Sequence, residues 1–305
     1  MKKLALLLAL LSFGQAFAQT STEEFRAKYE RQTRVAGQAG IGVETILDKW
    51  AESFPDDIDM LVGRYNYYYA KSRRTEVVQK PLAKFMGRTP VMTLKDADGK
   101  DVNWFEEDFF DDDLYAKSAS AIDRAIELKP DELALRIMLL NSLMAYEKEC
   151  PDMVTMELSQ LIEFSYGSGI RWKYDGKDVD DEFFQSMVQE YCVAFYDIAS
   201  PVSYESFLAI SQKMLSYHRK STLFLSNVGT YWLVVKKNDK VALKQYNKVL
   251  KIDPKDYPAA KNCVLIARKM KDVKLEKKYL PALIEASPSE NERASGKARL
   301  DYLSK

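Results

Sequence analysis

The chain has few of the residues on which most catalytic chemistry depends. It contains one histidine, His218, and three cysteines, Cys150, Cys192 and Cys263, with no C-x-x-C pair. It also lacks a zinc-binding spacing, a glycine-rich phosphate loop and the motif of a nucleophilic serine. These absences argue against a metalloenzyme, a nucleotide-binding enzyme or a serine hydrolase. We therefore expect no catalytic residues, no metal and no cofactor.

Glycine and proline are also scarce, with 12 and 10 copies in 305 residues, and helix-forming residues dominate the rest. This composition favours an all-α fold. The odd number of cysteines permits one disulfide and one free thiol. Alternatively, each cysteine is a small buried residue on a helix.

Apolar runs long enough to span a membrane are missing. The longest, residues 4–11, follows Lys2-Lys3 and precedes Ala16-Phe17-Ala18. A short basic start, a short apolar core and an A-x-A site predict a secretory signal peptide over residues 1–18, cleaved after Ala18. The mature chain would then begin at Gln19, lie in a periplasm or outside the cell, and have no transmembrane segment.

The two signs of charge balance overall but not locally. Residues 236–278 contain thirteen lysines and one arginine against five acids, whereas residues 96–113 contain nine carboxylates. In an exported protein we expect no nucleic-acid partner, so the lysines are interpreted as solvated helix faces, with an acidic partner or an anionic lipid headgroup left open. The acidic segment is interpreted as a solvated loop, because its glycine comes too early for a calcium-binding loop.

The clearest pattern in the chain is a repeat. Residues 223–254 and 257–288 each read as two helices closed by a proline, and the two prolines are 34 residues apart. A fixed period of this size predicts a helical solenoid, in which stacked helix pairs share one core. The matching positions are Ala242, Tyr246, Val249 and Pro254 in the first copy and Leu280, Leu283 and Pro288 in the second.

This pattern resembles the tetratricopeptide repeat (TPR), most closely from Gly229 to Pro254. The second copy departs from it, with Val264 and Glu276 where the family has glycine and alanine. The resemblance implies a right-handed α-α superhelical solenoid of TPR-like helix pairs. It also implies a concave groove, lined by the first helix of each pair, that holds peptides.

The remaining segments extend this architecture. We expect an N-terminal helix and glycine hinge over residues 19–42, the solenoid over 43–305 and a capping helix over 290–303. Two insertions, 73–112 and 165–178, share Asp-Gly-Lys-Asp-Val and predict two small β-hairpins, because Asp-Gly favours a two-residue turn.

The resemblance also implies a binding site. Superposed on the repeat, Asn66, Asn141 and Thr230 fall at one groove-facing turn, bordered by Tyr69 and Lys261. We therefore expect a non-catalytic protein-binding scaffold or adaptor of the cell envelope, holding a protein or peptide partner in the groove. The partner's identity and the oligomeric state stay open. Two alternatives are an envelope glycan-binding protein and a glycoside hydrolase on a helical toroid.

Overall fold

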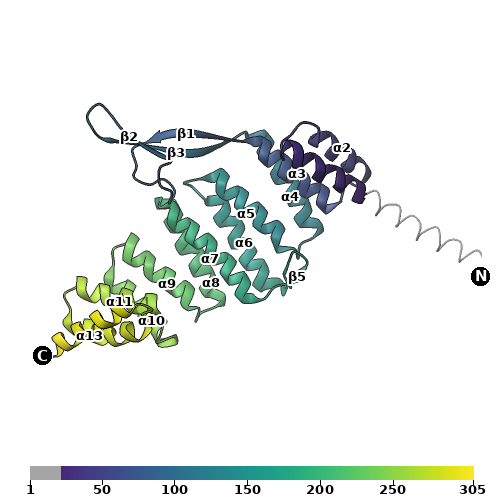
Figure 1. Ribbon diagram of the computed structural model, residues 1–305. Helices are drawn as coiled ribbons and strands as arrows, with labels where there is room; N and C mark the ends of the chain where they lie inside the picture. The colour runs from purple at the N-terminus through teal and green to yellow at the C-terminus, as the bar shows by residue number, and fades with distance from the viewer. Residues whose placement is uncertain (1–21) are drawn as a thin grey trace, which may run out of the picture. The chain divides into compact units, whose positions relative to one another are not determined.

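The computed structural model describes residues 22–305, so the predicted signal peptide and Gln19 lie outside the described residues. The described chain is mostly helical with two small antiparallel sheets, which confirms the helical fold class (Figure 1). It divides into two compact units. The first comprises residues up to 146 together with 171–179, and the second comprises 147–170 and 180–305. Over residues 22–305, no helix is long and apolar enough to cross a membrane.

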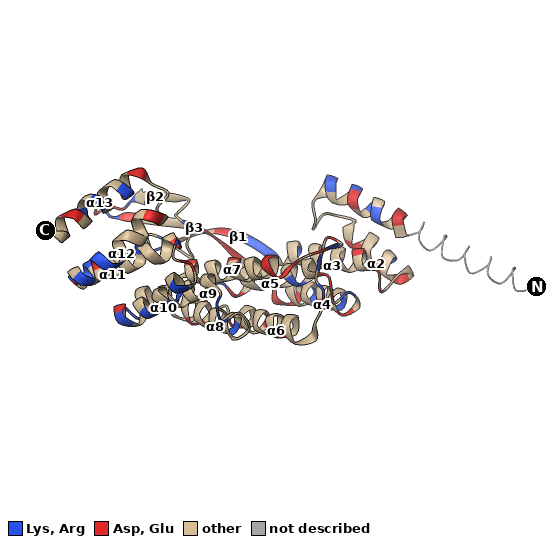
Figure 2. Cartoon of the chain, turned by 90° about the horizontal axis from the view of Figure 1, so that it is seen from below, with Lys and Arg blue, Asp and Glu red and all other residues tan. Residues whose placement is uncertain are grey.

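The first unit is built around the antiparallel pair α3 and α4. Asp57 and Asp111 cap these two helices, each accepting a hydrogen bond from a backbone N–H three residues on. The Tyr65 hydroxyl donates to the Met138 carbonyl (2.9 Å), which ties α3 to α5. In the first described helix, charges of both signs alternate (Figure 2). The helices of this unit are residues 22–36, α2 (Val43–Ser53), α3 (Ile58–Ser72), α4 (Asp112–Leu128) and α5 (Leu133–Glu147).

The first insertion contains the predicted hairpin, but a third strand extends it to a three-stranded sheet. Its strands are β1 (Arg73–Lys80), β2 (Met92–Lys95) and β3 (Asp101–Phe110), in the order β1-β3-β2. The acidic segment over residues 96–113 was predicted to be a solvated loop. This prediction is wrong for β3, because β3 pairs with both other strands. The expected two-residue turn is also wrong here. The chain reverses over residues 96–100, with Gly99 at a positive φ of 77° and the Asp96 N–H bonded to the Lys100 carbonyl.

The second insertion is a hairpin of two-residue strands, β4 (Lys173–Tyr174) and β5 (Lys177–Asp178). Asp175 and Gly176 between them both have positive φ, 51° and 73°, so the predicted Asp-Gly turn is confirmed. The buried Glu132 carboxylate accepts a hydrogen bond from the Asp175 N–H at 2.9 Å and holds the hairpin to the start of α5. Residues 165–168 belong to the preceding helix, so the insertion begins later than expected.

The second unit consists of helices. Each of the two predicted repeats contains a pair of helices. One feature was not predicted: α9 continues into a π-helical turn, where the Lys236 N–H donates to the Tyr231 carbonyl five residues back. The helices are α6 (Asp152–Ser168), α7 (Asp181–Ile198), α8 (Pro201–Tyr217), α9 (Thr222–Thr230), η1 (Tyr231–Val235), α10 (Asp239–Ile252), α11 (Tyr257–Lys269), α12 (Val273–Ala286) and α13 (Glu290–Ser304).

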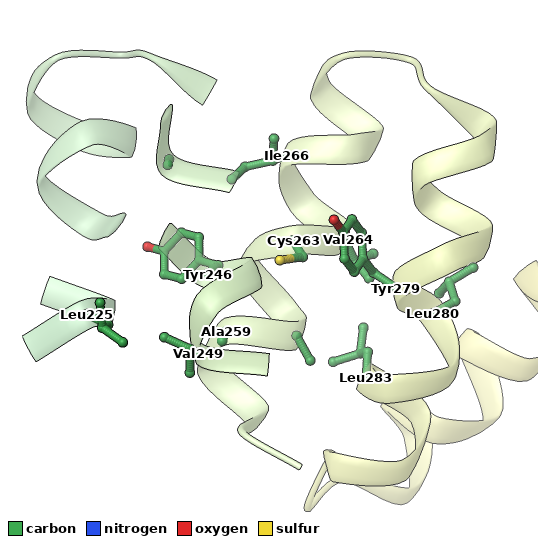
Figure 3. Packing of buried hydrophobic residues seen from close by; sticks show 12 residues of the cluster. Leu225, Tyr246, Val249, Ala259, Cys263, Val264, Ile266, Tyr279, Leu280 and Leu283 are labelled. Carbon is green, nitrogen blue, oxygen red and sulfur yellow. The ribbon is translucent and has the colours of Figure 1, made fainter. Parts of the chain in front are cut away.

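Apolar residues of the two repeats form one core cluster of the second unit, built from α9 to α12 (Figure 3). Gly229 is required by close packing, since a Cβ atom there would lie 2.8 Å from the ring of Tyr246. Tyr246 is itself buried, and it contacts α9 through the Thr230 hydroxyl at 3.0 Å. Ala242 is fully buried in the same cluster. The small and large residues of the repeat therefore have the packing roles that their spacing predicts.

One departure from the repeat, Glu276, has a physical reason. Glu276 is buried, and its carboxylate accepts hydrogen bonds from the Arg268 Nε at 2.6 Å and the Arg299 Nη2 at 2.9 Å. A long acidic side chain at this position joins α12 to α11 and to the final helix α13, which alanine could not do. Hydrogen bonding to Arg299, and then to Arg268, lowers the pKa of Glu276.

The three cysteines are all free thiols. Cys192 and Cys263 are buried, as one of the two interpretations expects, whereas Cys150 is exposed. Burial raises the pKa of both Cys192 and Cys263 to about 12, so neither is a reactive thiolate at neutral pH.

Candidate functional site

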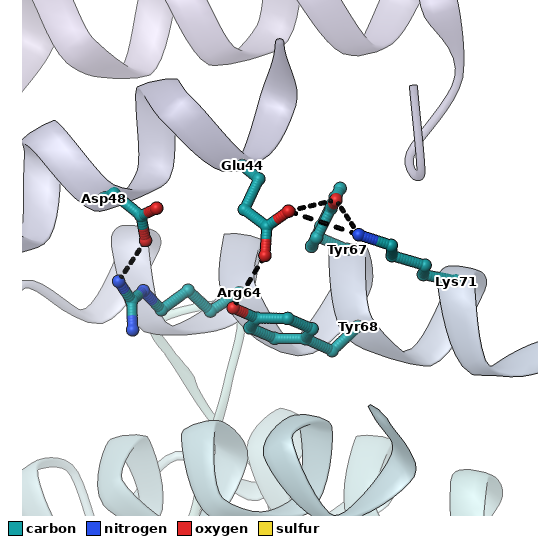
Figure 4. Close-up of polar contacts among 6 residues, drawn as sticks. All are labelled: Glu44, Asp48, Arg64, Tyr67, Tyr68 and Lys71. Carbon is teal, nitrogen blue, oxygen red and sulfur yellow. Dashed lines mark hydrogen bonds and ion pairs between the residues drawn. The ribbon is translucent and has the colours of Figure 1, made fainter. Parts of the chain in front are cut away.

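A polar network joins α2 to α3 in the first unit (Figure 4). The Glu44 carboxylate accepts hydrogen bonds from the Tyr67 hydroxyl at 2.8 Å, the Tyr68 hydroxyl at 3.2 Å and the Lys71 Nζ at 3.2 Å. Lys71 also donates to the Tyr67 hydroxyl at 2.7 Å. One turn further along α2, Asp48 pairs with Arg64 at 2.6 Å.

This network suits a structural role better than proton transfer. The hydrogen bond from Tyr67 lowers the pKa of Glu44, and the bonds to Tyr67 and Glu44 raise the pKa of Lys71. Burial raises the pKa of both tyrosines. Every shift therefore moves a pKa further from neutrality, whereas a general acid or base works best with a pKa near the working pH. The network fastens α2 onto α3.

A cleft of about 590 Å³ opens beside this network, between α3 and α4. Its basic side chains are largely neutralised. Arg64 pairs with Asp48, and Arg124 pairs with Asp56 at 2.9 Å and with Glu127 at 2.8 Å. Lys117 lies over the ring of Tyr68, with its Nζ 5.6 Å from the ring centroid. Because most of its charge is paired internally, the cleft does not select strongly for an anionic ligand.

The inserted sheet offers a more distinctive surface. Directly opposed residues of antiparallel strands share a face, and the register pairs Leu94 with Val102 and Met92 with Trp104. Trp104 is also opposite Gln79, so Val77, two residues earlier, lies on this face too. We call these five apolar residues the open face. The exposed fractions of Val77, Met92 and Leu94 are 51%, 43% and 50%.

The opposite face of the sheet is covered by the sheet's own connection. Phe105 is only 2% exposed because Phe85, from the segment between β1 and β2, packs edge-on against it at 5.9 Å. Lys80 lies over the Phe85 ring, 3.9 Å from its centroid. The segment is held by the Asn103 side chain, which donates to the Leu82 carbonyl at 2.8 Å. The sheet thus has apolar residues on both faces. Phe105 on one face is covered, whereas on the open face Val77, Met92 and Leu94 are exposed and Val102 and Trp104 are half-buried.

The predicted groove residues of the first unit already have partners within the chain. Burial raises the pKa of Tyr29, and a side-chain hydrogen bond from Asn66 opposes that rise, so Asn66 contacts the first described helix. Tyr69 stacks on Tyr65 at 5.8 Å and packs against Phe110 of β3 at 5.8 Å. Asn141 is exposed on α5 and also interacts with another part of the chain.

The same holds for the two predicted residues of the second unit. The Thr230 hydroxyl forms a hydrogen bond with the Tyr246 hydroxyl at 3.0 Å. Lys261 donates to the Tyr257 hydroxyl at 2.7 Å and pairs with Glu292 at 3.3 Å. The two residues thus have separate intramolecular partners. A ligand at any of these positions would have to share or displace an existing contact, and their role in binding stays a prediction.

The open face was missed because β1 was not predicted. Thr75-Glu76-Val77-Val78 is a short run with three β-branched residues directly after a helix, and this signal could have predicted a strand. Between residues 22 and 305, no group of three or more His, Cys, Asp or Glu side chains is placed to hold a metal ion. Comparison with known proteins finds no family model and no curated protein that matches this chain. The resemblance to the TPR family therefore depends on the repeat residues alone.

Proposed function

We propose that this chain is a non-catalytic protein-binding scaffold of the cell envelope. Its TPR-like helix pairs would stack into a right-handed superhelix, and the open face of the inserted sheet would contact the partner. The open face is the observation that supports this function. Contiguous exposed apolar residues are typical of interaction sites, because leaving them in water is unfavourable.

The strand order supports an extended apolar segment as the bound element. β2 is an edge strand of four residues, all exposed, and β1 is the other edge. An edge strand presents unpaired backbone donors and acceptors, so a partner strand can add to it while its side chains contact the adjoining face. Met92 and Leu94 would then lie beside the added strand.

A site-specific crosslinking experiment tests this surface in cells. A photo-crosslinking residue replaces Leu94 in one variant and Val35 in another. Val35 is an exposed apolar residue of the first described helix, outside the sheet, and serves as the matched control. We expect one discrete protein adduct from position 94, lost when Val77 and Met92 are changed to serine, and none from position 35. Adducts of equal yield at both positions would contradict the proposal that the open face contacts the partner.

The groove predicted from the sequence is tested in parallel. The partner lies in the groove if the double variant Asn66→Ala, Asn141→Ala captures less of the partner while its thermal stability is unchanged. In that case the double variant Val77→Ser, Met92→Ser should capture as much of the partner as the wild type. The two alternatives, glycan binding and glycoside hydrolysis, stay predictions that no contact in the described residues favours. A glycan array and chromogenic glycosides test them directly.

A further inference from the structure

A second unexplained surface lies on the two predicted repeats. Four lysines of α10 (240, 244, 248 and 251) and Lys278 of α12 line a groove of about 480 Å³ together with Leu243 and Asn247. We call this the lysine groove; the lysines of α10 lie on the blue segments of that helix in Figure 2. All of its lining residues belong to the second unit.

The lysine groove gathers five lysines on one surface. Three other lysines of the same unit are each paired with an acid: Lys236 with Glu205 at 3.0 Å, Lys255 with Glu285 at 3.0 Å and Lys269 with Asp239 at 2.7 Å. Across residues 22–305, no ion pair joins any of the five groove lysines to an acid, although Lys278 lies over the ring of Tyr279, with its Nζ 4.9 Å from the ring centroid. Lysines four residues apart on a helix also repel each other and destabilise it. This repulsion between the lysines of α10 lowers the stability of the helix, and a bound anion would offset it.

The length of the lysine stripe indicates a linear ligand. Residues 240 to 251 span about 16 Å along a helix at 1.5 Å per residue. An extended polypeptide covers that distance with roughly five residues. A single small anion would engage only one or two of these cations, whereas a segment with several carboxylates could face all of them.

The chemistry of the lining favours carboxylates over other polyanions. The groove has five lysines and no arginine, so it lacks the guanidinium forks that bind phosphate bidentately. No aromatic residue is among its lining residues, and Tyr279, which donates its hydroxyl to Asn247 Oδ1 at 2.7 Å, is buried and therefore not available for base stacking. Leu243 is only partly exposed and offers little apolar surface for insertion into a bilayer. The Asn247 amide nitrogen can donate to a backbone carbonyl.

We propose that the lysine groove binds an extended acidic segment of a protein partner, with several carboxylates facing Lys240, Lys244, Lys248, Lys251 and Lys278. This inference rests on the proposed protein-binding function and adds a second surface to it. The open face contacts apolar side chains, and the lysine groove recognises charge.

Fluorescence anisotropy with labelled decaglutamate tests the proposal on the full chain. The variant Lys244→Gln, Lys248→Gln, Lys251→Gln should bind about tenfold more weakly, since each exposed ion pair contributes a small factor and three are removed. The control Lys274→Gln, Lys277→Gln, Lys297→Gln removes the same charge from exposed positions outside the groove and should bind within about twofold of the wild type. Circular dichroism confirms that both variants are folded.

Three outcomes would overturn the proposal. One is equal weakening in both triple variants, which would mean attraction to net charge alone. Another is no binding of decaglutamate at low salt. The third is tighter, lysine-dependent binding of polyphosphate, single-stranded DNA or vesicles containing anionic phospholipid, which would assign the groove to that ligand. The Val77→Ser, Met92→Ser variant should bind decaglutamate normally, so failure of the open face and failure of the lysine groove give different results.

Discussion

Replacing Glu276 with glutamine should destabilise the C-terminal helices. The carboxylate accepts three hydrogen bonds, at 2.6 Å from Arg268 Nε and at 3.0 and 2.9 Å from Arg299 Nε and Nη2. A hydrogen bond to a charged group contributes about 1.5–3 kcal/mol net. The Glu276 side chain is 3% exposed, but those of Arg268 and Arg299 are 44% and 40% exposed, so water can solvate both arginines after the substitution. We therefore expect the three bonds together to account for about 2–3 kcal/mol of the free energy of unfolding.

Urea unfolding followed by circular dichroism measures this loss. Glu285→Gln is the matched control, because its ion pair with Lys255 is exposed on both sides, at 62% and 71%, and its removal should leave the unfolding midpoint unchanged. A Glu276→Gln variant as stable as this control would refute the conclusion that the hydrogen bonds of Glu276 with Arg268 and Arg299 stabilise the fold.

The pH dependence gives an independent check of the same ion pairs. Because the folded state lowers the pKa of Glu276, it binds fewer protons than the unfolded state near that pKa. The stability contributed by Glu276 is therefore full above the unfolded pKa of about 4.3 and is lost as the pH falls towards the folded pKa. The difference between wild type and Glu276→Gln should be constant from neutral pH to about pH 5 and shrink below that. A difference that persists at pH 3 would mean that ionisation of Glu276 is not its cause.

Further predictions concern packing, titration, processing and assembly. Gly229→Ala should cost about 1–3 kcal/mol in urea unfolding, because its Cβ would lie 2.8 Å from the buried Tyr246 ring, whereas Gly167→Ala, with nothing within 4 Å, should not destabilise. Burial raises the pKa of Tyr65 and Tyr246 to about 12, so the folded state holds protons that the unfolded state releases, and stability should fall between about pH 10 and pH 12; a flat alkaline profile would contradict this. Mass spectrometry of the protein isolated from cells should find Gln19 as the first residue; an intact Met1 would contradict export. If the helix pairs stack as proposed, X-ray scattering should give a radius of gyration well above the roughly 19 Å of a compact chain of this length.

The helices could be predicted from the sequence because each one has local signals. Asp57 and Asp111 are N-caps, and Pro254 follows the end of a helix, so the bounds of α3, α4 and α10 follow from single residues and an apolar stripe. The roles of Ala242 and Tyr246 also follow from repeat spacing, because neighbouring repeats repeat the same contacts.

The inserted sheet and the ion pairs of Glu276 could not be predicted in the same way. β1 pairs with β3 across a long separation, and neither the register nor the covering Phe85 leaves a periodic signal. Glu276 reads as a surface residue, because its partners Arg268 and Arg299 come from two other helices. The open face was missed for a similar reason, because the exposure of Met92 depends on which face of the sheet is covered by the loop between β1 and β2. The lysines of α10 were expected on a solvated helix face, but the sequence does not show which lysines are paired with acids.

The first insertion leaves and re-enters the helix pair at a single point. The Asp111 N–H donates to the Ser72 carbonyl at 2.9 Å, and Arg73 and Phe110 are paired next to it. Because α3 and α4 are already joined there, closing a loop of almost any length adds only a small entropic cost. Residues 74–109 could therefore be exchanged for a short turn, or for a different sheet, while the helices keep their contacts. Proteins with this helical body could acquire new partners by changing the insertion alone.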